Sequence, residues 1–225
     1  MNKTLYIVVA GIILILGVCF QVSAVSKSAK QVKADTRAFF KEDPAGIFDL
    51  IPKSQRLDML DYFDSNIDKE VENALNGKSK LLAATTEYVC VKISKGVTIE
   101  LWAPQPEQSS MIIANFTYSI PASDGNIKVF SANGYPLNSN WKPSTIEDFM
   151  LKIEKNSSLS KADVIALADI PIVYYTINRN ENTITAHLNI KEYLSAEDYD
   201  QISSYFKDSI TYKVKPAKNV FSIIE

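Results

Sequence analysis

Glycine is scarce in this sequence and is never clustered. Only seven of the 225 residues are glycine. Five of them lie beyond residue 24, at positions 46, 77, 96, 125 and 134, and no two of these lie within eight residues of each other. Loops that cradle phosphates need closely spaced glycines so that the backbone can approach the ligand. A serine nucleophile elbow needs glycine on both sides of the serine. The sequence therefore excludes the common nucleotide-binding and α/β-hydrolase patterns.

Histidine and cysteine are almost absent. His187 is the only histidine, and Cys19 and Cys90 are the only cysteines. Most zinc sites need three or four nitrogen or sulfur ligands, and this chain cannot supply them. A catalytic triad that uses imidazole as its base would have to use His187. We therefore expect no catalytic residue, no bound metal and no cofactor, and we interpret Cys90 as a small packed side chain.

The chain has no large excess of either charge. Its formal net charge is −2 at pH 7. Domains that bind nucleic acid carry a clear basic excess. We therefore expect no nucleic-acid partner.

The N-terminus has the three-part pattern of a signal peptide. Lys3 is a positive start, residues 5–20 are an uncharged, almost wholly apolar run, and a short polar exit ends at Ala24. Cleavage is predicted after Ala24. The run is shorter than the roughly 20 residues of a membrane span, so we expect no stable transmembrane anchor. A retained membrane anchor is one alternative, and lipid attachment at Cys19 is another, although Val18 fits a lipobox poorly.

Cleavage leaves residues 25–225, which are enough for a single domain with a sizeable core. Only Cys90 would remain, so no intramolecular disulfide is expected. An exported domain with balanced charge and no disulfide is typical of a periplasmic or secreted protein, and it differs from the small disulfide-rich modules found in many secreted proteins.

Apolar spacing predicts several helices. One helix or basic arm is expected over residues 27–41, and another begins at Pro52 with an apolar face that includes Leu57 and Leu60. Three further helix starts are marked by a serine three residues before an acid, which is the pattern of a capping box. These pairs are Ser144 with Glu147, Ser160 with Asp163, and Ser195 with Asp198.

Period-two alternation predicts about eight strands. They cover residues 88–93, 97–101, 111–120, 126–132, 172–178, 183–190, 209–214 and 219–224. In one hairpin an even turn should place Val173, Tyr175 and Ile177 opposite Leu188, Ala186 and Ile184. We therefore predict an α+β fold with antiparallel sheet and with helices packed on one face. The order of elements also permits two similar halves of a helix plus four strands each, 45–138 and 144–225.

Two charged stripes repeat with the same helical spacing. Lys27, Lys30, Lys33 and Arg37 form one, and Asp58, Asp61, Asp64 and Asp68 form the other. Solvated helix faces are the ordinary interpretation. Contact with anionic headgroups, cation binding by the acids, and pairing between the two stripes are the alternatives.

A few side chains are candidates for ligand contact. Trp102 falls out of phase with its buried neighbours, and Trp141 lies in a polar loop. His187 should lie on the polar face of its strand with Tyr174 across from it. Ser209 follows Asp208 in a pattern similar to bacterial O-glycosylation sites.

Residues 43–94 carry a resemblance to a known family. The most specific elements are the helix containing Arg56, Met59 and Tyr62, the segment 73–77, and the strand 88–94. They resemble the domain-of-unknown-function 3256 family of exported Bacteroides-type proteins, mainly over residues 43–120. The resemblance implies an envelope or exported protein, and the family carries no assigned activity, cofactor or catalytic residue.

We therefore expect a non-catalytic envelope domain that binds a protein, a glycan or a lipid. One alternative is a hydrolase that uses only carboxylates, as glycosidases do. Two acids such as Glu100 and Asp124 would then line one cleft. The other alternative is a structural or assembly subunit, which predicts a large exposed apolar patch.

Overall fold

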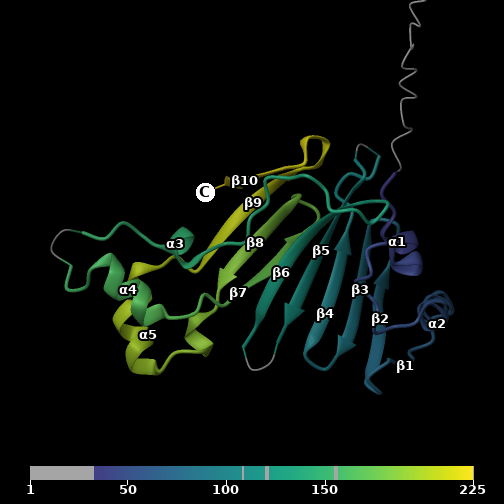
Figure 1. The fold of residues 1–225 in the computed structure, drawn as a ribbon, viewed down its shortest axis with the longest axis horizontal. Helices are drawn as coiled ribbons and strands as arrows, with labels where there is room; N and C mark the ends of the chain where they lie inside the picture. Colours follow the sequence, from purple (N-terminus) through teal and green to yellow (C-terminus); the bar gives the residue numbers. More distant parts are fainter. Residues whose placement is uncertain (1–32, 108, 120–121, 155–156, 225) are drawn as a thin grey trace, which may run out of the picture. The chain divides into compact units, whose positions relative to one another are not determined.

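The computed structural model describes residues 33–107, 109–119, 122–154 and 157–224. The predicted signal peptide, its cleavage point at Ala24, and Cys19, Lys27 and Lys30 lie outside these residues. Ten strands in two antiparallel sheets and five α-helices occupy the described part of the chain (Figure 1).

The first sheet has six strands, and each strand pairs with the next one along the chain. Its strands are β1 (Val71–Glu72), β2 (Lys78–Ala84), β3 (Tyr88–Ser94), β4 (Val97–Trp102), β5 (Met111–Tyr118) and β6 (Asp124–Ser131). The register between β2 and β3 shifts between Leu81 and Ala83. Strand β6 begins at Asp124, two residues before the start of the predicted strand 126–132.

The second sheet has four strands in the order β10-β9-β8-β7. They are β7 (Val173–Asn178), β8 (Thr183–Leu188), β9 (Ser209–Lys215) and β10 (Val220–Ile224). The predicted pairing of Val173, Tyr175 and Ile177 with Leu188, Ala186 and Ile184 is confirmed.

The helices divide between the sheets. The helices α1 (Thr36–Glu42) and α2 (Lys53–Asp64) lie beside the first sheet, where they contact β2, β3 and β4 (Figure 1). The helices α3 (Ile146–Phe149), α4 (Lys161–Ala168) and α5 (Ala196–Ile202) contribute apolar residues to the core of the second sheet.

Two of the three predicted helix caps are confirmed. Ser160 and Ser195 accept hydrogen bonds from the N–H groups of Asp163 and Asp198. The prediction for Ser144 is wrong by one residue, because Thr145 forms the capping box of α3. Ser144 is buried instead, with its hydroxyl 2.9 Å from that of Tyr212.

The α+β class is confirmed, but the expected number of about eight strands is too low. The two additional strands are β1, which has only two residues, and β2. In β2 the register shift between Leu81 and Ala83 breaks the alternation of apolar and polar residues. A strand cannot be recognised from the alternation of apolar and polar residues when a bulge changes the face that its residues occupy.

Strand β5 is buried on both faces and connects two apolar clusters. Ile112, Ala114 and Phe116 belong to the cluster under α1 and α2. Met111 and Ile113 belong to the cluster formed with the second sheet and α3 to α5. Strand β5 therefore lies between the two clusters, and the neighbouring strands β4 and β6 also contribute residues to both.

The edge of the second sheet is partly covered by a side chain. The amide of Asn140 donates to the carbonyl of Phe221 at 2.8 Å and accepts from its N–H at 2.7 Å. Asn140 thus occupies the outward backbone groups of β10 at this position.

No helix within the described ranges combines the length and the apolar character that crossing a bilayer requires.

We expect Ile112→Ala and Ile113→Ala each to lower the free energy of unfolding by about 2–5 kcal/mol, because each creates a cavity in a fully buried position. Both variants should unfold in one transition, since β5 belongs to both clusters. Urea titrations followed by far-UV circular dichroism and by tryptophan fluorescence would measure this. The matched control is Leu82→Ala, whose side chain is 48% exposed and which should change stability by about 0.5 kcal/mol. Two separated transitions would instead indicate halves that fold independently.

Candidate functional site

The best candidate for a ligand site is an apolar pocket at one end of the first sheet. Its volume is about 450 Å³, within the usual range for small-molecule sites. Its lining residues come from one loop, one turn and three strands: Gly46, Ile47, Phe48, Asp49 and Leu50 of the loop; Asn73, Leu75 and Gly77 of the turn; and Ile93 and Ser94 of β3, Val97 and Ile99 of β4, and Phe116 and Tyr118 of β5. Leu50, Leu75 and Tyr118 are 38%, 71% and 45% exposed, so part of the apolar lining faces solvent.

The turn at residues 73–77 is fixed by Asn73. Its side-chain N–H groups donate to Ser79 Oγ and to the carbonyl of Ile93, at 3.1 and 3.0 Å. Its side-chain oxygen accepts from the N–H groups of Leu75 and Gly77, both at 3.0 Å. The buried amide of Asn73 is thereby fully used inside the protein, and the pocket wall stays apolar in character.

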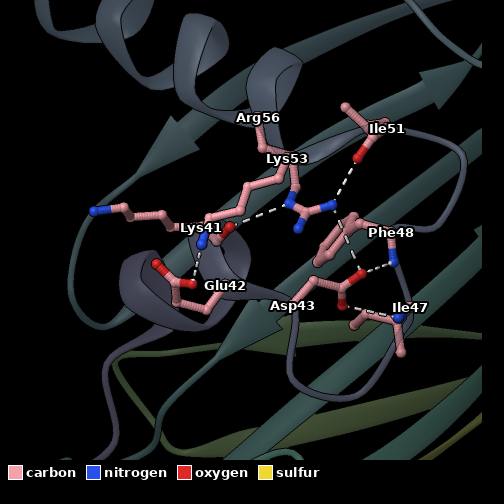
Figure 2. A network of polar contacts seen from close by, with 8 residues as sticks. All are labelled: Lys41, Glu42, Asp43, Ile47, Phe48, Ile51, Lys53 and Arg56. Carbon is pink, nitrogen blue, oxygen red and sulfur yellow. Dashed lines mark hydrogen bonds and ion pairs between the residues drawn. The ribbon is translucent and has the colours of Figure 1, made fainter.

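The loop at residues 44–51 is organised by Asp43 (Figure 2). Asp43 ends α1 in the left-handed conformation, with φ of 49°. Its two carboxylate oxygens accept hydrogen bonds from the N–H groups of Ile47 and Phe48, at 2.8 and 2.9 Å. These bonds fold the loop back so that Ile47 and Phe48 line the pocket.

Arg56 of α2 holds the same loop from the other side (Figure 2). Its Nη1 lies 3.9 Å from Asp43 Oδ2 and donates to the carbonyl of Ile51 at 2.6 Å. Its Nε donates to the carbonyl of Lys41 at 3.3 Å. The side chains of Arg56 and Asp43 are only 8% and 4% exposed. One guanidinium therefore joins the end of α1, the pocket loop and the start of α2.

The pocket loop also packs closely on the segment after β6. Gly134 has a φ of 83°, and a Cβ at this position would lie 2.4 Å from the carbonyl carbon of Pro44. Only glycine fits this approach without moving the loop. The carbonyl of Leu50 accepts from the N–H of Ala74 at 2.9 Å, which connects the loop to the turn at 73–77.

Sequence reasoning missed this site, although a signal for it exists. The helix beginning near Pro52 was expected to bury Leu57, but Leu57 is 36% exposed while Arg56 is 6% exposed. Arg56, Met59 and Leu60 share one stripe at helical spacing, and all three are buried. An arginine on an apolar stripe indicates a buried cation that needs an acidic partner.

The structure places three of the sequence candidates in one row on the second sheet. Tyr174 pairs with His187, which pairs with Ser209. The rings of Tyr174 and His187 are stacked, 4.7 Å apart at 13°, and Thr176 Oγ1 lies 2.9 Å from His187 Nε2. Partial burial lowers the pKa of His187. Ser209 is exposed.

The two tryptophan candidates belong to the core of the second sheet. Trp102 is 3% exposed and offers no surface to a ligand. Trp141 packs edge-to-face on Tyr175, Tyr212 and Phe221, with ring centres 5.0–5.5 Å apart. It also lines a second cavity of about 360 Å³.

Glu100 and Asp124, the acids considered for hydrolysis, have different hydrogen-bond partners. Glu100 accepts from the Tyr88 hydroxyl at 2.5 Å and from the Asn115 side chain at 2.8 Å. Asp124 begins β6 and accepts from the N–H of Val173 at 3.3 Å. In the described ranges no group of three potential metal ligands from His, Cys, Asp and Glu occurs.

The described members of the two charged stripes make one ion pair with each other. Arg37 lies 2.5 Å from Asp64, so one member of each stripe is paired. Lys33 pairs instead with Glu107, and Asp68 pairs with Lys80.

Removing Asp43 should destabilise the protein strongly. Asp43→Ala leaves the guanidinium of Arg56 buried without its acid, so we expect the free energy of unfolding to fall by about 3–5 kcal/mol. Glu42→Ala breaks the exposed pair with Lys53 and should leave the free energy of unfolding nearly unchanged, because solvent screens exposed ion pairs. Chemical denaturation of both variants would measure the difference. Adding Arg56→Met to Asp43→Ala should recover part of the lost stability. If the stability losses of the two single variants simply added up in the double variant, Asp43 and Arg56 would not stabilise each other, contrary to what we expect.

Cys90 should react slowly with thiol reagents. Burial, and next the charge of Glu100, raise the pKa of the Cys90 thiol to about 11. Because the thiolate is the reactive form, its population at pH 8 should be about 100-fold smaller than in the unfolded chain. Reaction of a Cys19→Ser chain with a disulfide reagent, with and without urea, would measure the ratio. Glu100→Gln should speed the reaction of the folded protein, because it removes the negative charge that raises the pKa of Cys90. Equal reaction rates in the folded and the unfolded chain would show that the fold does not raise this pKa.

One comparison with known proteins supports the fold, and none assigns an activity. A solved structure of a domain of an uncharacterised protein from Porphyromonas gingivalis W83 is similar, with a TM-score of 0.71 and 16% sequence identity over 86% of this chain and 99% of the other. No curated protein matches. The model of a family described as a protein of unknown function (DUF3256) matches residues 27–218. The match extends well beyond residues 43–120, and the chain belongs to this family.

Proposed function

We propose that this chain is an exported, non-catalytic envelope protein that binds a small apolar molecule, such as the acyl chain of a lipid, in the pocket at the end of the first sheet. The observation that carries the proposal is the pocket itself, whose walls are mostly apolar and whose rim exposes Leu75 and Tyr118. The N-terminal sequence, which has the pattern of a signal peptide, supports the exported location.

The chemistry of the wall favours an apolar ligand over a glycan. Sugars are held by hydrogen bonds to several hydroxyl groups, so their sites need unused donors and acceptors. Asn73, the buried amide of the wall, makes all its hydrogen bonds inside the protein. Ile99 and Phe116 add apolar surface with no polar group. Burying an apolar chain against such a wall gains about 25 cal/mol per Å².

The dimensions of the site favour a small molecule over a protein partner. A stable protein interface buries about 800 Å² on each side, whereas this site is a concave space of about 450 Å³. A site of this kind suits a ligand that enters between the loop and the sheet. The Asp43–Arg56 contact keeps the loop in place without the ligand.

The test is the binding of N-phenyl-1-naphthylamine, a neutral apolar dye whose fluorescence rises in apolar surroundings. We expect saturable binding by the wild-type chain. Leu75→Ser should weaken it about fivefold, because it removes about 1 kcal/mol of apolar contact at the rim. Val97→Phe, which fills the pocket from the sheet, should weaken it further.

Leu82→Ser is the matched control. Leu82 is an exposed leucine of β2 that does not line the pocket, so the dye should bind this variant as it binds the wild type. Thermal unfolding of all three variants would establish that they are folded. Equal binding by Leu75→Ser, Val97→Phe and the control would show that the dye binds elsewhere and would refute the proposal.

A further inference from the structure

The apolar pocket carries a single charge. Among the residues that line it, Asp49 is the only one charged at neutral pH. It lies in the loop fixed by Asp43 and Arg56, two residues before Ile51, whose carbonyl Arg56 holds. The residues that line the pocket around the ligand's apolar part would therefore be neutral, and Lys128, whose ammonium lies 5.2 Å from the ring centre of Phe116, is not one of them.

The carboxylate of Asp49 lies over Gly46. A Cβ built on Gly46, whose φ is 65°, would lie 3.6 Å from Asp49 Oδ1. Asp49 takes part in none of the ion pairs formed by the described side chains. Its side chain is exposed. Within the described ranges, therefore, no cation forms an ion pair with the negative charge at the pocket.

Two lysines come directly after pocket-lining residues in the sequence, so their charges are the first to consider as partners of Asp49. Neither lysine itself lines the pocket. Lys78 follows Gly77 and pairs with Glu72 at 3.3 Å. Lys95 follows Ser94 in the turn between β3 and β4. Because Lys95 forms none of the ion pairs between described side chains, we choose it as the positive group to compare with Asp49.

We infer that the pocket selects apolar molecules whose polar end is positively charged and disfavours those that end in a carboxylate. This inference rests on the proposed function and adds a ligand class to it. An ammonium group beside Asp49 is attracted to the carboxylate, whereas a fatty-acid carboxylate is repelled. At about 4 Å in water one such charge contact changes affinity about fivefold.

The experiment compares three ligands with the same ten-carbon chain and different ends: decylammonium, decanol and decanoate. Each displaces N-phenyl-1-naphthylamine from the full-length chain at pH 7 and low salt. We expect decylammonium to bind about fivefold more tightly than decanol, and decanol about fivefold more tightly than decanoate. The differences between the three affinities should become smaller in 1 M salt, which screens exposed charges.

Asp49→Asn is the decisive variant, and Lys95→Gln is its matched control. Asp49→Asn should bring the three affinities close together while the affinity for decanol stays the same. Lys95→Gln should keep the wild-type order. Asp49 is exposed, so the variant should unfold at the wild-type temperature.

The outcomes separate this inference from the proposed function. If decanoate binds as tightly as decylammonium, or if Asp49→Asn keeps the wild-type order, the inferred selectivity is wrong while the apolar site stands. If Lys95→Gln abolishes the order and Asp49→Asn does not, Lys95 and not Asp49 sets the preference, which also overturns the inference. If decanol displaces no dye, the proposed function itself fails.

Discussion

The carboxylate of Asp43 and the guanidinium of Arg56 meet where three backbone segments converge. The carboxylate orients the loop by accepting hydrogen bonds from the N–H groups of Ile47 and Phe48. The guanidinium donates hydrogen bonds to the carbonyls of Lys41 and Ile51. Both side chains are almost fully removed from water. A buried ion pair gives little net stability, but each partner is costly to leave alone. The contact therefore specifies one loop conformation, and the apolar pocket exists because the loop is held in that conformation.

The first sheet provides the other, rigid side of the pocket. Its strand β5 is covered on both faces, so Phe116 faces the pocket while Ile113 on the opposite face packs against the core of the second sheet. A wall supported from behind in this way cannot collapse easily into an empty cavity. The pocket thus lies between a loop fixed by polar contacts and a strand fixed by apolar packing, and the two supports are chemically independent.

Much of the fold could be predicted from local patterns, whereas the site could not. The hairpin of β7 and β8 was predicted with its register because Tyr175 and Ala186 alternate regularly with polar residues. Strand β2 was missed because its bulge near Leu81 interrupts that alternation. The pocket depends on segments distant in sequence, the loop at 44–51 and Phe116, which no single periodicity relates. The position of Arg56 on an apolar stripe was the local sign of this long-range contact.

The side chain of Asn140 has a consequence for how the molecule meets its own copies. Strand β10 contains no charged residue and lies at the edge of its sheet, which is the usual template for intermolecular pairing. Asn140 presents an amide with the donor and acceptor of a peptide group, and it fills the outward hydrogen bonds of Phe221. The Asn140 side chain thereby takes the place that one residue of a further strand would occupy beside Phe221. Fewer backbone groups of β10 are left open to pair with another copy of the chain, which is how aggregation through an edge strand begins.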